Sequence, residues 1–209
     1  MTATTTRTRR HLRTKQAILD AAREIIAEDG INALSMRALA DRIDYSPAGL
    51  YEYYGSKEEI VTAMCEEGQR FLYEAMAEVD RALPPVDYLY EIGLAYIRFA
   101  LEHPDYFLVM FTAAPPPDMA GVSEDAVREM MQQEGSPYGI LLRAIQHGID
   151  EGTFPVRPGF GLHEMGYAAW TLVHGIAMLR TTALRYYPGD LDAADHHALL
   201  NFMRGLQTA

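Results

Sequence analysis

The residues of this chain that could do chemistry gather between positions 44 and 57, in the run Asp-Tyr-Ser-Pro-Ala-Gly-Leu-Tyr-Glu-Tyr-Tyr-Gly-Ser-Lys. Small residues at 46–49 would let the backbone and short side chains reach the edges of DNA bases, and the hydroxyls and the cation that follow can hold phosphates. The composition therefore predicts a DNA-contact surface. We expect it to be formed by Arg37, Ser46, Pro47, Ala48, Gly49, Tyr51, Tyr53 and Lys57.

Other arrangements that would indicate catalysis or metal binding are incomplete. His163 begins a sequence like that of a zinc-protease helix, but Tyr167 stands where the second ligand would be. His196 and His197 are adjacent, so they would point to different sides of a helix. Cys65 lies next to acids that disfavour its thiolate. We therefore expect no catalytic residues, no metal site and no cofactor.

The elements that must position the DNA-contact residues are helices. Nearly every segment has the periodicity of an amphipathic helix, and no run alternates with period two for long enough to indicate a sheet. A first helix is expected over about 14–29, with Gly30 as its stop. Ser35 caps a short helix through about residue 43, and Ser46-Pro47 starts a third helix that ends near 54–55. The chain is therefore predicted to be all-α.

The remaining helices follow from capping residues and helix breakers. Ser56 and Glu59 form a capping box that opens a long fourth helix reaching about residue 83, where two prolines end it. Further helices are expected over about 86–102, 104–112, 136–151, 159–182 and 190–207, with a weaker one near 124–133. The predicted total is about nine or ten helices.

The two short helices form a candidate DNA-binding motif. A pair of short helices joined by a tight turn and braced by a longer preceding helix is the layout of a helix-turn-helix. The alternative is an ordinary helical hairpin inside a bundle. The small residues at 47–49 favour the first interpretation, because a helix meant for core burial would carry larger aliphatic side chains there.

The distribution of charge favours a polyanion at one end of the chain. The net charge is −11 at pH 7, which by itself opposes DNA binding. Residues 1–55, however, hold eight Arg/Lys against seven Asp/Glu, whereas residues 56–209 hold ten against twenty-two. DNA would therefore be attracted to the N-terminal part and repelled by the remainder. Five cations precede the first acid, Asp20, and they are Arg7, Arg9, Arg10, Arg13 and Lys15. The alternative is that these cations form a basic tail without a target.

The composition also bears on location. The longest apolar stretches, such as 106–114, are too short to span a bilayer, and no apolar run follows the cations at the N-terminus as in a secretory signal. A single cysteine excludes an intrachain disulfide. We expect a cytoplasmic protein with no membrane contact.

A dense set of residues keeps a known order and spacing over roughly 11–71. The set comprises Ile18, Ala21-Ala22, Gly30, Ser35-Met-Arg-Ala-Leu-Ala40, Ser46, Leu50-Tyr51, Tyr54 and Ser56-Lys57-Glu58-Glu59. In these residues the chain resembles the tetracycline-repressor (TetR) family of transcriptional regulators. Trp170, His174 and Gly175, with His103-Pro104 before them, resemble the C-terminal subclass of that family that carries a Trp-His-Gly (WHG) motif.

The resemblance implies an all-α chain of three parts. A flexible basic arm over 1–10 precedes a DNA-binding domain over 11–71, in which the helix-turn-helix occupies about 34–54. A long helix joins this three-helix domain to an effector-binding and dimerisation domain over 72–209. The resemblance also implies a homodimer whose third helices enter successive major grooves of a double-stranded, pseudo-palindromic operator.

Roles for the DNA-contact residues follow from the same resemblance. Arg37 and residues 47–49 would approach bases, while Tyr51 and Lys57 would hold phosphates; Tyr53 stands where family members often contact DNA, and Tyr54 is either a contact or a core aromatic. The family usually has glycine in the turn where this chain has Asp44. Aspartate tolerates left-handed backbone better than most residues, so the turn is expected to survive.

The acidic C-terminal part is expected to dimerise and to bind an effector. Two helices per subunit would make a four-helix dimer interface, and the alternative is burial within the monomer. The first stripe comprises Leu162, Gly166, Ala169, Val173, Ile176 and Ala177, whose small members let a helix approach closely, and the second comprises Leu191, Ala194, Ala198, Phe202 and Leu206. Most large apolar residues there must be core, but flexible methionines and aromatics also suit a pocket for an apolar or amphipathic small molecule. The expected lining is Tyr96, Phe99, Phe107, Met110, Phe111, Tyr138, Trp170 and His174.

The leading hypothesis is therefore a ligand-responsive repressor that is not an enzyme. One alternative is a DNA-binding regulator controlled by a protein partner. Another, from a different class, is an all-helical small-molecule carrier or enzyme without DNA binding.

Overall fold

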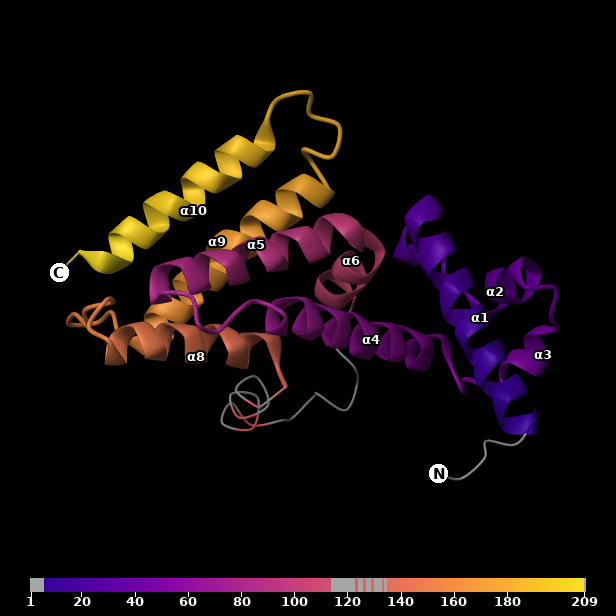
Figure 1. Cartoon of the computed structure of the whole chain (residues 1–209). Helices are drawn as coiled ribbons and strands as arrows, with labels where there is room; N and C mark the ends of the chain where they lie inside the picture. The colour runs from indigo at the N-terminus through magenta and orange to yellow at the C-terminus, as the bar shows by residue number, and fades with distance from the viewer. Residues whose placement is uncertain are drawn as a thin grey trace. The chain divides into compact units, whose positions relative to one another are not determined.

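The computed structural model describes residues 6–113 and 135–208, together with Ser123, Ala126, Glu129 and Gln133 (Figure 1). Over this part of the chain it shows nine α-helices, one short 3-10 turn and no strand, so the all-α prediction is confirmed. The weak helix expected near 124–133 falls largely outside the described residues. By their internal contacts the residues form two compact units, which divide α4 at Gly68 and place α6 from Asp105 onward in the first unit.

The first unit begins with three helices and a 3-10 turn. They are α1 (Thr6–Asp29), η1 (Ile31–Ala33), α2 (Met36–Arg42) and α3 (Pro47–Leu50). α1 packs on α2, which in turn packs on α3. Ile18 and Ala22 of α1, Leu39 of α2 and Leu50 of α3 are fully buried. α1 starts eight residues earlier than expected, so positions 6–10 lie on a helix, whereas the sequence predicted a flexible basic arm over 1–10.

Two helix ends differ from the sequence prediction. α3 ends at Leu50 and is followed by turns, and α4 (Lys57–Ala77) ends six residues before the expected position. After α4, the Asp80 carboxylate accepts a hydrogen bond from the backbone N–H of Ala82 at 2.9 Å, which stabilises a turn in place of another helical turn.

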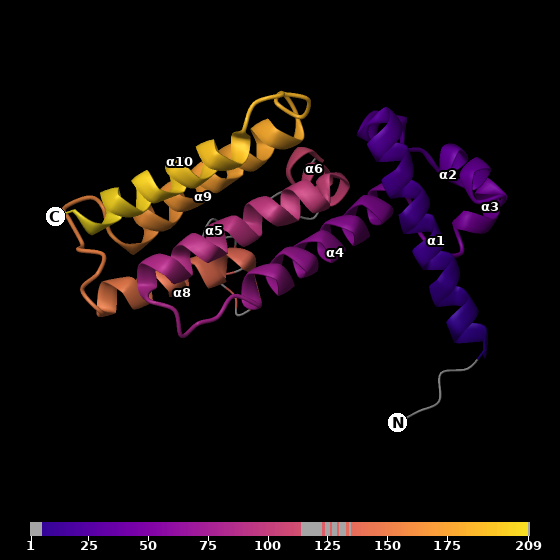
Figure 2. The same ribbon diagram turned by 45° about the horizontal axis from the view of Figure 1, so that its top comes forward.

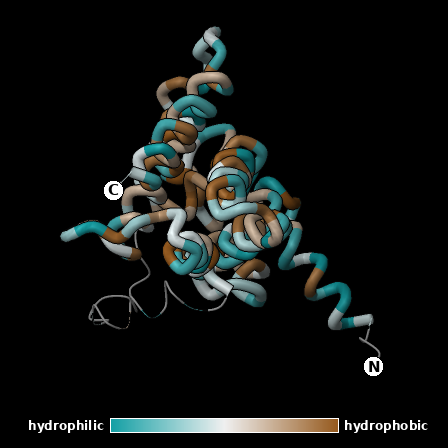
Figure 3. Tube along the Cα trace, turned by 60° about the vertical axis from the view of Figure 1, so that its left-hand side comes forward, coloured by the Kyte–Doolittle hydropathy of each residue, from teal (hydrophilic) through white to brown (hydrophobic). Residues whose placement is uncertain are grey.

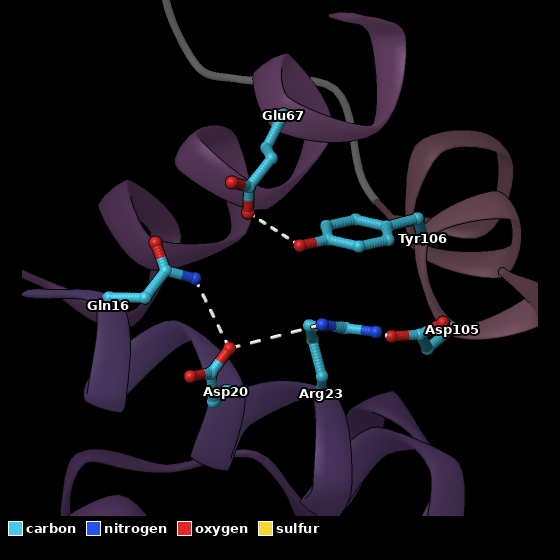
Figure 4. A network of polar contacts seen from close by, with 6 residues as sticks. All are labelled: Gln16, Asp20, Arg23, Glu67, Asp105 and Tyr106. Carbon is cyan, nitrogen blue, oxygen red and sulfur yellow. Dashed lines mark hydrogen bonds and ion pairs between the residues drawn. The ribbon is translucent and has the colours of Figure 1, made fainter. Parts of the chain in front are cut away.

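A polar network joins α1, α4 and α6 (Pro104–Thr112) inside the first unit (Figure 4). The Arg23 guanidinium donates to the Asp105 carboxylate and lies 4.5 Å from the centre of the Tyr106 ring. Tyr106, only 1% exposed, donates its hydroxyl hydrogen to the carboxylate of Glu67 on α4. The network therefore fixes α6 against the helices that brace the helix-turn-helix.

The second unit is a bundle built around α5 (Pro85–Glu102). This helix contacts α8 (Pro137–Asp150), α9 (Leu162–Thr181) and α10 (Leu191–Gln207), and Figure 2 shows it among them. In Figure 3 hydrophilic and hydrophobic residues follow one another along the helical coils, as expected for helices that bury one face.

The stripe of small residues expected to form a dimer interface lies inside the second unit. Gly166, Ala169, Val173 and Ala177 are all buried within the monomer. An atom added at the Cβ position of Gly166 would lie 2.6 Å from Leu142 on α8, so this glycine permits close packing of α8 on α9. For these four residues the prediction of contact with a partner subunit was therefore wrong, because periodicity does not distinguish burial within a subunit from burial between subunits.

None of the helices in the described ranges is both long and apolar enough to traverse a bilayer.

Candidate nucleic-acid interface

The turn between α2 and α3 has the strained backbone that its sequence predicted. Ser35 caps α2 by accepting the Ala38 N–H at 3.1 Å. Asp44 has φ +53°, the one left-handed non-glycine residue in the described part of the chain. The Tyr45 N–H donates to the Ala40 carbonyl at 2.9 Å, which closes the helix end as in a Schellman motif. Asp44 thus occupies the position where helices usually carry glycine.

The tip of α3 is small and exposed. Ser46 caps the helix, because its hydroxyl oxygen accepts the Gly49 N–H at 3.0 Å, and Pro47 occupies the first helical position. Pro47 and Ala48 face solvent while Leu50 is fully buried. A Cβ atom at Gly49 would lie 3.1 Å from the Ser46 hydroxyl and 3.2 Å from the Tyr45 ring, so glycine lets Tyr45 pack against α3. We call residues 35–54 the reading head.

The tyrosines that follow α3 divide into core and surface. Tyr54 is 4% exposed and packs in the core, with the Lys15 ammonium 4.5 Å from its ring centre, so the core alternative is the correct one for Tyr54. Tyr51 is 55% exposed. The hydroxyls of Tyr53 and Tyr45 lie 3.4 Å apart, and this hydrogen bond is the main cause that lowers the pKa of Tyr53.

The two expected cationic contacts lie at helix starts. Lys57 opens α4 and is half-buried; Ser56 caps this helix by accepting the Glu59 N–H at 3.1 Å. Arg37, in the first turn of α2, has a side chain that is 89% exposed and lies 4.0 Å from the Asp41 carboxylate. An exposed pair at this distance holds the guanidinium weakly, so Arg37 can turn to another anion at little cost.

Arg42, by contrast, has a structural role. Its guanidinium donates to Glu24 at 3.1 Å and to Glu28 at 2.7 Å on α1. The hydrogen bonds to Glu28 and Glu24 raise the pKa of Arg42. This pair of contacts holds α2 on α1 and so fixes the angle of the reading head.

Two residues of this surface were missed by the sequence reasoning. Tyr45, 38% exposed, contacts Tyr53 edge to face at 6.2 Å between ring centroids. His11 stacks on the other side of the cluster, with its ring centroid 4.8 Å from that of Tyr53 and an interplanar angle of 26°. The periodicity of α1 could have indicated His11, since it is seven residues before the buried Ile18 on the same helical face.

The residues expected to line an effector pocket lie in both units. In the second unit the Tyr96 hydroxyl lies 2.9 Å from Nδ1 of His174, and the Trp170 ring lies 6.0 Å from His174 and 5.6 Å from Tyr138. Burial raises the pKa of Tyr96 and lowers that of His174, so both are neutral at pH 7. Phe99 is 2% exposed on α5 of the same unit.

The other three expected lining residues lie on α6 in the first unit. Phe107 is fully buried and its ring lies 5.0 Å from that of Phe111. An added Cβ atom at Gly68 would lie 2.6 Å from the Met110 sulfur, so Met110 packs closely on α4.

The described residues contain no group of three or more His, Cys, Asp or Glu side chains that could hold a metal ion.

A capped helix-turn-helix on an all-α scaffold defines the class of this protein. Residues 18–64 match the bacterial regulatory proteins of the tetR family, and residues 89–202 match the tetracyclin repressor-like C-terminal domain. The chain therefore belongs to the tetR family.

Individual relatives agree with this assignment. The HTH-type transcriptional regulator YobS of Bacillus subtilis is 29% identical over 94 residues, which are 45% of this chain and 49% of YobS. UidR of Escherichia coli, also an HTH-type transcriptional regulator, is 35% identical over 78 residues, 37% of this chain and 40% of UidR. The chain thus spans half or less of the length of the curated relatives it matches.

A solved structure shows the same fold over most of the chain. A tetR-family regulatory protein from Rhodococcus RHA1 superposes with a TM-score of 0.69 at 20% identity and covers 93% of this chain and 97% of its own.

Proposed function

We propose that this protein is an operator-binding transcription regulator, a repressor that a small apolar or amphipathic molecule releases from DNA. The observation that carries the proposal is the reading head, with its exposed tip of Pro47 and Ala48 held by the Ser46 cap. Arg37 and the tip would face base edges, while Tyr51, Tyr53 and Lys57 would hold phosphates. With few long polar groups at the tip, sequence preference would rest on thymine methyls, water and DNA shape.

A matched pair of charge substitutions tests the DNA-contact surface. Ala48→Glu would place a carboxylate on the exposed tip, and Ala27→Glu would place one on the exposed side of α1 away from it. By fluorescence anisotropy at low salt, with DNA from upstream of the gene, we expect wild type and Ala27→Glu to bind and Ala48→Glu to lose binding by at least about tenfold. Equal affinity of the two variants would contradict this placement of the surface, and a wild type that binds no DNA specifically would contradict the regulator itself.

The effector site is proposed around Tyr96, Tyr138, Trp170 and His174. These side chains combine three aromatic surfaces with hydroxyl and imidazole groups that remain neutral, as expected for a ligand that is largely apolar and carries one or two hydrogen-bonding groups. Such a ligand can release DNA only if it binds the DNA-free state more tightly.

The single tryptophan provides the measurement for that site. Trp170 is the only tryptophan of the chain, so its fluorescence reports on this cluster alone. We expect at least one member of a panel of apolar and amphipathic compounds to change this fluorescence and to weaken DNA binding at the same concentration. DNA binding that no compound alters, while a protein partner does, would favour control by that partner.

A homodimer is proposed through the exposed faces of α9 and α10. On α9, Tyr167 and Leu179 are 65% and 51% exposed, and Thr171 and Gly175 lie between them at steps of four residues on one helical face. Large exposed apolar side chains flanking a glycine are suited to close packing by a second helix. Two reading heads related by a two-fold axis would then require a pseudo-palindromic operator.

A further inference from the structure

We propose, resting on the DNA-binding function above, that the first two turns of α1 form a second DNA-backbone contact. In this contact Arg7 and Arg10 hold phosphates on the side of the helix that faces Tyr53. This surface extends the contact of the reading head along one DNA strand. It adds phosphate contacts but no base contacts.

The face of α1 that would meet DNA is set by helical geometry. Arg7, Arg10, His11 and Thr14 have the spacing i, i+3, i+4, i+7 that gathers side chains on one side of a helix. Ile18 continues the same stripe and is fully buried against the head. The side of α1 that is buried in the core at Ile18 is therefore exposed and basic two turns closer to the N-terminus. This side of α1 is the one on which α3 lies.

Direct contacts hold this part of α1 to the reading head. His11 stacks on Tyr53 at 4.8 Å, and Tyr53 in turn contacts Tyr45. The pKa of Tyr53 is lowered by its hydrogen bond to Tyr45, then by one to Thr14 and by the positive charge of Arg10. Arg10 thus lies close to the tyrosine that the resemblance places on DNA, and the basic face and the head form one surface.

The arginines of this segment are available to an external anion. No acid precedes Asp20 in the chain, and in the described part of the molecule neither Arg7 nor Arg10 forms an ion pair with a carboxylate. The segment is exposed from residue 6 to residue 13. Arginines carried on a helix lose less conformational entropy on binding than those of a flexible arm, so each phosphate contact retains more of its favourable free energy.

The chain contains its own control. Arg9 and Arg13 belong to the same two turns and are also exposed, but successive steps of 100° place them about 180° and about 140° from Ile18, which faces the head, whereas Arg7 and Arg10 lie about 20° and about 80° from it. Arg7→Ala/Arg10→Ala and Arg9→Ala/Arg13→Ala therefore remove the same charge from the same helix and differ only in the face that is altered.

The test is a titration of operator DNA by full-length protein at several salt concentrations, followed by fluorescence anisotropy. For Arg7→Ala/Arg10→Ala we expect at least about tenfold weaker binding near physiological salt. The slope of log K against log salt should be smaller by about 3.6 for the proposed dimer, since each of its two heads loses two phosphate contacts and each lost contact removes about 0.9. Arg9→Ala/Arg13→Ala should stay within about threefold of wild type with its slope unchanged. Circular dichroism checks that α1 remains helical in both.

A third variant tests the register of the helix. His11→Ala leaves every arginine in place but removes the stack on Tyr53. We expect this variant to lose less affinity than Arg7→Ala/Arg10→Ala. In hydroxyl-radical footprints we expect it to lose protection of the DNA backbone beside the major-groove contact.

Three outcomes are distinguishable. Equal losses in the two double variants would show a general charge effect and overturn the proposed face, and no loss in either would overturn the contact while leaving the regulator intact. A wild type that binds no operator would remove both proposals.

Discussion

At the scale of single residues, Asp44 is the one non-glycine residue, among those the structure describes, with a left-handed backbone. Its φ of +53° places it in the left-handed region, where a side chain costs about 1–2 kcal/mol that glycine avoids. Glycine also adds freedom to the unfolded chain, worth about 0.5–1 kcal/mol. We therefore expect Asp44→Gly to raise the free energy of unfolding by up to about 1 kcal/mol, and Asp44→Ala to lower it by about 1 kcal/mol.

Thermal unfolding measures both changes, and Asp41→Gly is the control. Position 41 lies within α2, where glycine should cost about 1 kcal/mol. If glycine were as harmful at 44 as at 41, the left-handed turn would not exist in solution.

Lys57 carries the second prediction at this scale. As a phosphate contact it should act alike on every DNA sequence, so Lys57→Ala should weaken specific and non-specific binding by a similar factor. It should reduce the salt slope by about two, because each of the two heads of the proposed dimer loses one contact. Arg70→Ala removes the same charge from the exposed side of α4 in the second unit and should leave both quantities unchanged. A change confined to sequence preference would mean that Lys57 reads bases instead.

At the scale of elements, the network between α1, α4 and α6 defines the first unit. The Tyr106 hydroxyl donates to Glu67 from a buried position, and burial raises the pKa of this tyrosine, which keeps it a donor at all ordinary pH values. A hydrogen bond to a charged group contributes about 1.5–3 kcal/mol. Tyr106→Phe should therefore destabilise the packing of α6 by about that amount.

Amide hydrogen exchange across α1, α4 and α6 would measure this loss. Tyr90→Phe is the matched control, because the Tyr90 hydroxyl is hydrogen-bonded to His196 at a more exposed position in the second unit. We expect exchange in α1 and α6 to accelerate in Tyr106→Phe alone. Unchanged protection of α1 and α6 would show that side-chain packing and the Arg23–Asp105 ion pair are sufficient to hold α6 in place.

Elements were predictable from sequence where their determinants are local. Ser35 and Ser46 act through backbone groups three residues away, so the start of each short helix could be placed from sequence. The start of α1 could not, because residues 6–13 are polar and basic and carry no apolar periodicity that would mark a helix. Contacts such as His11–Tyr53 and Tyr106–Glu67 join residues 42 and 39 positions apart and leave no periodic signal.

At the scale of the whole molecule, two glycines lie on the helices through which the dimer is proposed to form. Gly175 on α9 and Gly205 on α10 have no atom within 4 Å of an added Cβ, unlike Gly166, which is filled by its own subunit. Open space beside a helical glycine indicates either solvent or a surface kept clear for a partner. The exposed Tyr167 and Leu179 on the same stripe of α9 favour a partner.

Gly175→Leu separates these two readings of the surface. Within a monomer the leucine has room and a better helix propensity by about 1 kcal/mol, so thermal stability at low concentration should hold or rise. In a two-fold dimer each new side chain would meet the facing helix, and overpacking of about 1–3 kcal/mol at each of the two sites should weaken association by more than tenfold. Sedimentation velocity over a concentration series measures this, with Ala27→Leu on the exposed side of α1 as the control. If the proposed dimer binds its operator through two heads together, Gly175→Leu should also weaken binding to a two-half-site DNA far more than to a single half-site. A Gly175→Leu protein that stays dimeric would place the subunit interface on another face of the bundle.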